Sequence, residues 1–317
     1  MVRVANLPEP TPEFNQRCLN IINQFNSGQL AYESALAELD KLAHEADSSG
    51  HLVNQGRVQQ LIAYIQHYRG NLDVSIYHNE QARALYARAG NPRRVATIDL
   101  NQGENYRFKG EFNRAAKLYR AAYEVAEQFD DIRLQALASS NEALVLLALK
   151  KYDEAFTIFN KSLKLANQLD IQQTDVAGIF CEIYHGLAVI HLYKGELQLA
   201  WMRAMEALQV AEQVNQLHIK GYANRTLGEV LTEMKTAPDS RFSSDPDTYF
   251  RMSIEFLQEL KAEAEIARTM FAQALSLAKR GKRTTAAKLL QQVMDMFTKL
   301  GMVDDATRAA EAQLSLM

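Results

Sequence analysis

Hydrophobic side chains recur along most of the chain with the spacing of an α-helix. Ala115, Leu118, Tyr119 and Ala122 follow the i, i+3, i+4, i+7 pattern that places apolar groups on one helical face. The stretch from Ala155 to Ser162 repeats this arrangement. Since no segment shows a clear alternation of hydrophobic and polar residues between turn signals, the pattern predicts an all-α protein.

The pattern itself repeats about every 40 residues. Gly70, Gly110, Lys150, Gly195 and Gly281 are separated by 40, 40, 45 and 86 residues, the last step being two repeats of 43. A small side chain stands seven residues before and five residues after each of these positions. The first set is Ala63, Gly103, Ala143, Ala188 and Ala274, and the second is Ser75, Ala115, Ala155, Ala200 and Ala286.

This ladder of small residues indicates helices that pack closely. Antiparallel helices approach to about 8–10 Å only where the facing side chains are small and larger ones fill the gaps beside them. The sequence therefore predicts an extended tail over residues 1–12 and a single superhelical domain over residues 13–317. That domain has seven helical hairpins and a closing helix, with an insertion at 235–247 in the sixth hairpin. The expected helices cover 13–27, 30–47, 52–69, 72–89, 92–109, 112–129, 132–149, 152–169, 174–194, 197–215, 219–234, 246–260, 262–280, 283–300 and 302–316.

The two ends of the array fit the repeat less well than its middle. Glu33 occupies a ladder position in the first hairpin, unless the register slips there by one residue. In the closing helix the apolar periodicity predicts an inward face formed by Val303, Ala306, Ala309, Ala310 and Leu314.

The repeat resembles the tetratricopeptide repeat. The best match runs through Asn101-Gln102-Gly103, Tyr106, Lys109-Gly110-Glu111-Phe112, Ala115, Tyr119 and Ala122, and Leu227-Gly228 supplies the family's Leu-Gly pair in another unit. Units near 40 residues, rather than 34, are similar to the long-repeat branch found in kinesin light chains, bacterial peptide-sensing regulators and MalT-like activators. The resemblance implies a right-handed superhelix, or α-solenoid, whose first helices line a concave groove.

Composition and charge narrow the possible partners. The 35 Lys and Arg residues nearly balance 38 Asp and Glu residues, giving a net charge of −3, so we expect no nucleic-acid partner. The longest wholly apolar run, 143–149, is too short to span a bilayer, and the N-terminus lacks a signal-peptide core. We therefore expect a cytoplasmic protein with no membrane partner. Cys18 and Cys181 form no paired motif and are expected to be buried thiols.

No catalytic, metal-binding or cofactor-binding motif stands out, so the sequence predicts neither an enzyme nor a cofactor. His185 and His191 lie six residues apart, about 240° around a helix, and cannot share a metal as an i, i+4 pair can. The basic turn from Lys279 to Arg283 either contacts an anionic partner or forms a solvated helix end.

The repeat register predicts the residues of the concave groove. Asn101 and Asn141 share one register position, where related proteins use asparagine amides to pair with a ligand backbone; the alternative is that both are neutral exposed side chains. We also expect Phe242 in the 235–247 insertion either to close over a ligand or to belong to a tolerated loop. The predicted peptide-binding residues are Tyr64, Asn101, Glu104, Arg107, Asn141, Leu144, Leu147, Val189, Tyr193 and Arg225.

Two functions fit this pattern. The first is a non-catalytic interaction scaffold that binds a peptide or partner segment in its groove. The alternative is a ligand-sensing regulatory module of a MalT-like signalling or transcription system, which would act through a separate effector. The sequence leaves the identity of the partner and the oligomeric state open.

Overall fold

Fifteen α-helices follow one another in a computed structural model that describes residues 7–172 and 176–316. Those two ranges contain no β-strand, so the all-α prediction is confirmed. Helix boundaries agree with the expected ones to within a few residues, although the expected start at residue 174 lies outside the described residues. The helices are α1 (Pro12–Asn26), α2 (Tyr32–Ser49), α3 (Leu52–Arg69), α4 (Leu72–Arg88), α5 (Pro92–Phe108), α6 (Phe112–Gln128), α7 (Ile132–Ala148), α8 (Tyr152–Ala166), α9 (Val176–Tyr193), α10 (Leu197–Gln213), α11 (Leu217–Met234), α12 (Pro246–Glu259), α13 (Glu263–Lys279), α14 (Arg283–Lys299) and α15 (Val303–Leu314).

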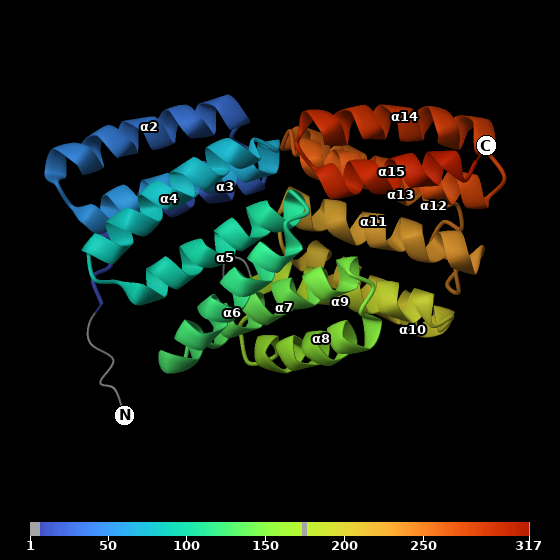
Figure 1. Ribbon diagram of the computed structural model, residues 1–317, viewed down its shortest axis with the longest axis horizontal. Helices are drawn as coiled ribbons and strands as arrows, with labels where there is room; N and C mark the ends of the chain where they lie inside the picture. Colours follow the sequence, from blue (N-terminus) through green and yellow to red (C-terminus); the bar gives the residue numbers. More distant parts are fainter. Residues whose placement is uncertain (1–6, 173–175, 317) are drawn as a thin grey trace.

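Successive helices pair into seven antiparallel hairpins, α1 with α2 through α13 with α14 (Figure 1). We call the odd-numbered members the first helices and the even-numbered members the second helices. First helices contact neighbouring hairpins as well as their own partners, so they are buried on several sides. In α9, for example, eleven residues are buried, whereas the second helix α6 buries only four. The first helices therefore form the inner layer.

The predicted ladder of small residues is buried at all ten positions. The paired helices can approach closely because aromatic rings of second helices lie directly over small residues of first helices. A Cβ on Gly56 would lie 2.7 Å from the ring of Tyr86, and the Tyr119 ring covers Gly103 even more closely. The space left at Gly103 lets the Tyr119 hydroxyl pass inward and donate a hydrogen bond to Glu104. Small and large positions thus complement each other as the spacing predicts.

The two ends of the superhelix meet. Helix α3 contacts α13, so α3, α5, α7, α9, α11 and α13 form a closed ring of first helices. N-terminal and C-terminal helices accordingly lie next to each other along the top of Figure 1. Arg69 donates a hydrogen bond to Glu263 across the junction at 2.7 Å. The repeat pattern did not predict this closure.

Three turn glycines make the close approaches at this junction. A Cβ on Gly28 would lie 2.7 Å from Leu217, one on Gly70 2.6 Å from Leu300, and one on Gly110 2.8 Å from Asp304. Each of the three has a positive φ between 76° and 86°. Glycine therefore serves two purposes here, because it permits the left-handed turn and leaves room for the opposite end of the chain.

Two expectations for the ends of the chain are wrong in detail. In the first hairpin, Ala35 takes the buried ladder position while Glu33 is exposed, so the register slips by two residues because the turn before α2 is longer. In the closing helix, Val303 and Leu314 are 68% and 67% exposed, because the helix turns Met302, Asp305 and Ala309 inward. The hydrogen bond from Arg268 to Asp305 at 3.0 Å helps to fix that orientation.

Segments outside the helices pack against them. Of the predicted tail, residues 1–6 lie outside the described residues, and Glu9 pairs with Arg94 on α5. In the 235–247 insertion, the Phe242 ring packs edge-on against Trp201 of the second helix α10, 5.6 Å between centroids. This loop aromatic is therefore held by the apolar core between α10 and α11.

One described helix, Val176–Tyr193 (α9), is long and apolar enough to cross a membrane by length and composition alone. Within the fold, 61% of that stretch is buried, because α9 packs against α7, α8, α10 and α11.

Candidate functional site: the inner surface of the helical ring

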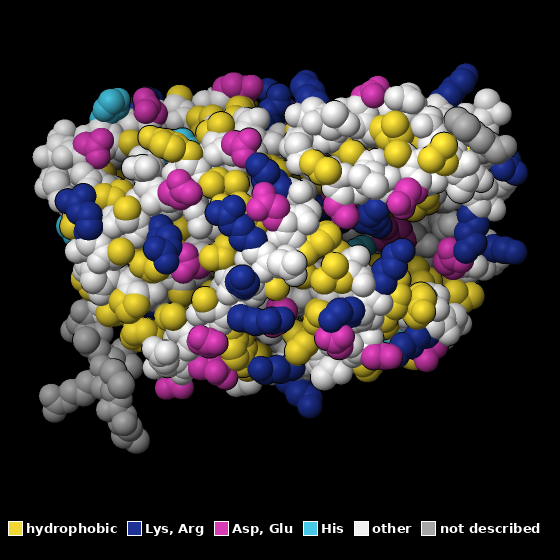
Figure 2. Space-filling view, viewed as in Figure 1, with side chains coloured by type: hydrophobic (Ala, Val, Ile, Leu, Met, Phe, Trp, Pro, Cys, Tyr) yellow, Lys and Arg dark blue, Asp and Glu magenta, His cyan; other side chains and the backbone are white. Residues whose placement is uncertain are grey.

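Side chains that point from the first helices towards the centre of the ring form what we call the inner surface. They recur every three or four residues, as one face of a helix requires. Helix α9, for example, contributes Glu182, His185 and Val189, and α11 contributes Tyr222, Arg225 and Glu229. Figure 2 shows basic, acidic and histidine side chains gathered around a hollow in the right half of the displayed face.

Several of the ten predicted groove residues contact one another or other inner side chains. Tyr64 donates a hydrogen bond to Asn26 at 3.0 Å, and Asn101 is half-buried. Glu104 and Arg107 bind each other, whereas Arg225 binds Glu265 from the neighbouring first helix α13. These residues lie on α3, α5 and α11, as the register predicts.

The apolar members of the predicted set divide into two groups. Leu144 and Leu147 pack against the central core cluster and are half-buried, as is Val189. Tyr193, by contrast, is 65% exposed at the end of α9 and stacks on Tyr152 with 3.8 Å between centroids. Tyr193 therefore lies at an outer turn, away from the charged part of the inner surface.

Three arginines of the inner surface are each bonded to a carboxylate. Arg107 donates to Glu104 at 2.6 Å within one helix, and Arg225 donates to Glu265 at 2.5 Å. Arg268 bonds both Glu265, at 3.3 Å, and Asp305, at 3.0 Å. Burial alone would raise the pKa of Glu265, but Arg225 and Arg268 lower it to about 2. Glu265 is therefore ionised, and its charge is neutralised by the two arginines.

Glu182 and Glu229 have no such arginine. The Oε2 atom of each is buried without a hydrogen-bond partner among the described residues. Burial, reinforced by the nearby charge of Glu104, raises the pKa of Glu182 to about 8. Burial raises the pKa of Glu229 to about 7, although Arg225 opposes it. Near neutral pH Glu182 thus holds a proton that an ordinary glutamate lacks, and Glu229 is partly protonated.

A row of aromatic rings joins α3 to α11 across the inner surface. Tyr64 contacts Tyr68 at 4.8 Å, Tyr68 contacts His218 at 5.2 Å, and His218 contacts Tyr222 at 6.2 Å between centroids. His218 is only 6% exposed, and its Nδ1 has no hydrogen-bond partner in the described part of the chain. Burial lowers the pKa of His218 to about 4, so the ring is neutral and one of its nitrogens is an acceptor.

His185 of α9 faces α11 in the same region. Its Nδ1 is 2.9 Å from the Thr226 hydroxyl and 3.6 Å from Glu229. Burial, together with Arg225, lowers the pKa of His185 to about 3. Since the ring is neutral, it does not neutralise Glu229.

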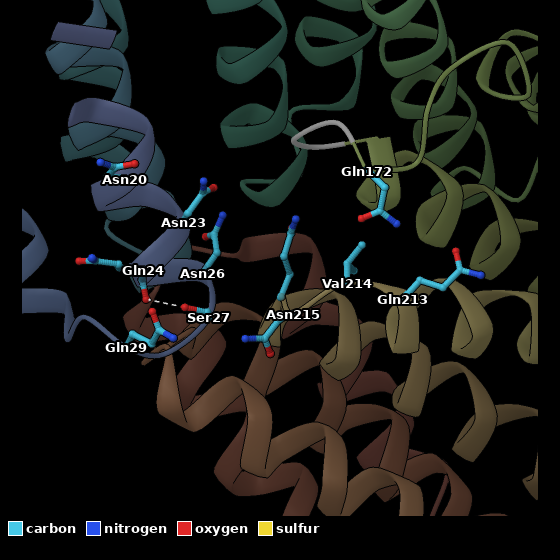
Figure 3. A pocket seen from close by; sticks show the side chains of 11 residues that line it. Asn20, Asn23, Gln24, Asn26, Ser27, Gln29, Gln172, Gln213, Val214 and Asn215 are labelled. Carbon is cyan, nitrogen blue, oxygen red and sulfur yellow. Dashed lines mark hydrogen bonds between the residues drawn. The ribbon is translucent and has the colours of Figure 1, made fainter. Parts of the chain in front are cut away.

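A pocket of about 420 Å³ opens at one end of this surface, between α1 and the α10–α11 connection. Its residue Asn26 accepts the Tyr64 hydrogen bond, and Gln216 stands two residues before His218. In Figure 3 the side chains from α1 and from residues 213–215 face the same space. Nine of its eleven lining residues carry carboxamides, namely Asn20, Asn23, Gln24, Asn26, Gln29, Gln172, Gln213, Asn215 and Gln216. The entrance is therefore uncharged and rich in hydrogen-bond donors and acceptors.

The other features that the sequence suggested provide weaker evidence for a functional site. The basic turn at 279–283 is largely neutralised, since Arg280 binds Asp247 at 2.6 Å and Lys279 pairs with Glu233. Cys18 and Cys181 are buried, and burial raises the pKa of Cys18 to about 11. Among the described residues no three His, Cys, Asp or Glu side chains gather as metal ligands would.

Sequence reasoning missed four important members of the site, Glu182, His218, Glu265 and Arg268. One signal was available for Glu182, because it is the only charged residue in the otherwise apolar stretch Val176–Tyr193. A lone acid in a buried helix requires a partner or a function. The other three depended on which face of α11 and α13 turns inward.

No protein-family model matches the sequence, and a comparison with curated proteins finds no match. Solved structures, however, resemble the fold along most of the chain. A Rap protein complexed with Competence and Sporulation Factor aligns with a TM-score of 0.58 and 12% identity, covering 97% of this chain and 98% of that one. Aspartyl phosphate phosphatase F from Bacillus subtilis aligns at 0.63 and 13% identity, covering 90% and 70%.

A third similar structure is the Rap conjugation gene regulator of plasmid pLS20 in complex with the Phr* peptide, with a TM-score of 0.57 and 14% identity, covering 98% of this chain and 97% of that one. Identities this low establish a likeness of fold alone. The chain thus has the tetratricopeptide-like helical-repeat fold that its spacing predicts.

Proposed function

We propose that this protein is a non-catalytic regulatory scaffold that binds a peptide or a partner segment on its inner surface. The observation that carries the proposal is a concentration of buried polar atoms without partners. Of six such side-chain atoms in the described residues, five lie on the adjacent first helices α7, α9 and α11. Leaving one such atom unsatisfied costs about 1–3 kcal/mol, so water or a ligand is needed to complete them.

A peptide suits this surface because its backbone carries a donor and an acceptor at nearly every residue. Asn101 is half-buried, so its amide is partly accessible to an extended chain, and the Oδ1 of Asn141, a side chain 1% exposed, has no partner in the described residues. Leu144, one turn beyond Asn141 on α7, and Val189 on α9 are half-buried and offer apolar contacts for ligand side chains. The amide-rich pocket provides a polar entrance from the α1 side.

Two of the similar structures support the same choice, since they are described as complexes with Competence and Sporulation Factor and with the Phr* peptide. We assign no reaction to the inner surface, because its arginines are bound to carboxylates and its thiol, Cys181, is buried on α9. We place the protein in the cytoplasm, as the sequence predicts.

The ligand-sensing alternative draws support from a specific feature. Contacts such as Arg69 with Glu263 close the ring and limit the room for a long partner. A small ligand would then bind inside, and an effector on another chain would respond.

Peptides that co-purify with the chain, identified by mass spectrometry and synthesised, provide the test. We expect Asn101→Ala to weaken binding by 1–3 kcal/mol, about 5- to 150-fold, because a ligand backbone group loses its partner. Asn113→Ala, on the exposed side of the second helix α6, is the matched control and should bind as the wild type. Isothermal calorimetry measures both. Unchanged affinity in Asn101→Ala and Asn141→Ala would move the ligand off the inner surface.

A further inference from the structure

The segment that precedes α1 is extended. Residues 7–11, with the sequence Leu-Pro-Glu-Pro-Thr, form no helix, strand or turn, and we call them the tail segment. Its two prolines and the next one, at position 12, fix their own φ and keep the residue before each of them extended. Thr11 accordingly has φ −59° and ψ 141°, the dihedral angles of a polyproline II helix. The tail segment therefore has the conformation that proline-rich peptides adopt when they bind a protein.

Two buried asparagines hold the backbone of the tail segment. The Nδ2 atom of Asn91, the residue before α5, donates a hydrogen bond to the carbonyl oxygen of Pro8 at 2.7 Å. The Oδ1 atom of Asn54, in the first turn of α3, accepts one from the backbone N–H of Thr11 at 3.0 Å. Asn91 is 0% exposed and Asn54 6%, and Pro10, between the two bonded residues, is also buried. The N-terminal ends of α3 and α5 thus bind an extended backbone at two points.

The side chain of the tail segment is bound as well as its backbone. The Nε atom of Arg94 donates a hydrogen bond to the Glu9 carboxylate at 2.8 Å, and the Nη2 atom contacts the same oxygen. The Arg94 guanidinium also lies 5.5 Å from the centre of the Tyr86 ring, which favours a cation. Its backbone N–H is bonded to Asn91 at 3.0 Å. This arginine is therefore held in a position that selects an acid between two prolines.

The tail segment is held less firmly than the surface that receives it. Glu9 is 46% exposed, and ion pairs with so exposed a partner contribute little to stability. The segment is kept in place mainly by its link to α1, which gives it an effective concentration of about a millimolar. Helices α3 and α5, by contrast, are fixed by their contacts with α4. A segment of another molecule that makes the same contacts more tightly can replace the tail segment without moving the helices.

We propose that the N-terminal ends of α3 and α5 form a binding site for an extended Pro-acid-Pro segment of another protein, and that the tail segment occupies this site as an internal competitor. The inference goes beyond the proposed function, because Asn54, Asn91 and Arg94 are not among the residues of the inner surface described above. The two amides pair with backbone groups and fix the register, whereas the arginine reads the acid. The tail segment of a second copy is a poorer occupant, because each copy already makes these contacts within itself.

The experiment measures binding of a fluorescein-labelled Leu-Pro-Glu-Pro-Thr peptide to the full chain by fluorescence anisotropy. In Glu9→Lys, Arg94 repels the tail segment and the site becomes free. We expect this variant to bind the peptide at least about tenfold more tightly than the wild type, in which the internal segment competes. Glu13→Lys, the same charge change on the exposed first turn of α1, is the matched control and should bind as the wild type. Wild-type affinity in Glu9→Lys overturns the inference.

A reversal of charge then locates the site. Arg94→Glu repels both the tail segment and the acidic peptide, so this variant should prefer a Leu-Pro-Lys-Pro-Thr peptide by at least about tenfold, whereas Glu9→Lys should prefer the acidic peptide by a similar factor. Equal binding of the two peptides to both variants overturns the inference. Should Arg94→Glu fail to fold, the two peptides on Glu9→Lys decide, because equal binding there overturns it equally.

Two further outcomes identify the source of the ligand and separate this site from the inner surface. Sedimentation of the wild type over a range of concentrations tests for a second copy, and a dimer that Arg94→Glu abolishes would overturn another protein as the source. A peptide whose affinity depends on Asn101 but not on Arg94 supports the inner surface alone. The Pro-Glu-Pro peptide should show the opposite dependence, so either site can fail while the other remains.

Discussion

Two parts of the inner surface hold the same kind of acid at similar depth and treat it in opposite ways. On α13, Glu265 is bonded to Arg225 and Arg268, and its pKa falls to about 2. On α9, Glu182 has no arginine of its own, and its pKa rises to about 8. The difference shows that burial alone does not fix the charge of an acid; the neighbouring helix does. We interpret the part around Glu265 as structural and the part around Glu182 as a candidate for ligand binding.

Breaking the paired part should give the largest effect on stability. Replacement of Arg225 by Met keeps an unbranched side chain but leaves the Glu265 carboxylate with weaker compensation in a buried place. We expect a loss of about 3 kcal/mol in the free energy of unfolding, measured by urea denaturation. In the unpaired part, Glu182→Gln removes no ion pair and should not lose stability at neutral pH. A similar loss in both variants would contradict the comparison.

Substitutions that overfill the space between helices should destabilise the hairpins around Glu265 and around Glu182 equally. The two parts differ in charge and not in how closely their helices pack. Ala115 on α6 and Ala200 on α10 are fully buried ladder residues beside α5 and α9, respectively. We expect Ala115→Leu and Ala200→Leu each to destabilise the protein by about 2 kcal/mol, because the added methyl groups overfill the space between helices. Denaturation with guanidinium measures both. A negligible loss in either one would mean that its hairpin is not closely packed.

The dependence of stability on pH should distinguish the two acids. Because the folded-state pKa of Glu182 is raised from 4.5 to about 8, the folded protein holds a proton that the unfolded chain has lost between these values. Stability from this group therefore falls as pH rises from about 5 to about 8, by about 1 kcal/mol or more. Glu265, with its pKa lowered to about 2, contributes stability above pH 4.5 that is lost as pH falls towards 2.

The pH experiment compares the wild type with Glu182→Gln by thermal unfolding at pH 5, 6, 7 and 8. The thermal stability of the variant relative to the wild type should increase as pH rises, since glutamine does not titrate. Glu229 contributes in the same direction and is present in both proteins. Parallel pH curves for the two proteins would show that Glu182 is ionised normally.

The smallest effect is expected for an ion pair on the outside. Arg17 and Glu45 form two hydrogen bonds at 2.8 Å between α1 and α2, but both side chains are about half exposed. Glu45→Gln should change the free energy of unfolding by no more than about 0.5 kcal/mol, because solvent and salt screen such pairs. A loss as large as that of Arg225→Met would show that burial is not the reason why the ion pair of Glu265 contributes more to stability than the ion pair of Glu45.

The helical hairpins were predictable from the sequence because the same packing of small and large side chains recurs in each repeat. Helix α3 begins and ends at the predicted residues, and Ala63 and Ser75 are buried as the ladder requires. The two-residue slip at Ala35 was not predictable, since only the conformation of the preceding turn sets it. Val303 looked apolar and inward, but the pairing of Asp305 with Arg268 on another helix decides the rotation of α15.

The candidate site was predictable only where the repeat register fixes a position. Glu104, Arg107 and Arg225 follow from that register, and all three take part in inner ion pairs. Which acids remain unpaired depends on contacts between residues 40 to 78 positions apart in the chain, such as Arg225 with Glu265 or Glu182 with Glu104. The residue spacing within one repeat contains no information about contacts between side chains of different repeats.

The contacts of Gly28, Gly70 and Gly110 with the C-terminal helices change how the array should unfold. A row of repeats behaves as a one-dimensional chain of nearest-neighbour couplings, and its terminal units fray first because each lacks a neighbour. Here α3 and α13 are neighbours, so the ring of first helices from α3 to α13 has periodic boundaries and neither of these two helices is a free end. Amide exchange in α3 and α13 should then be about as slow as in α7, and cutting the chain anywhere in the ring should turn it back into a row.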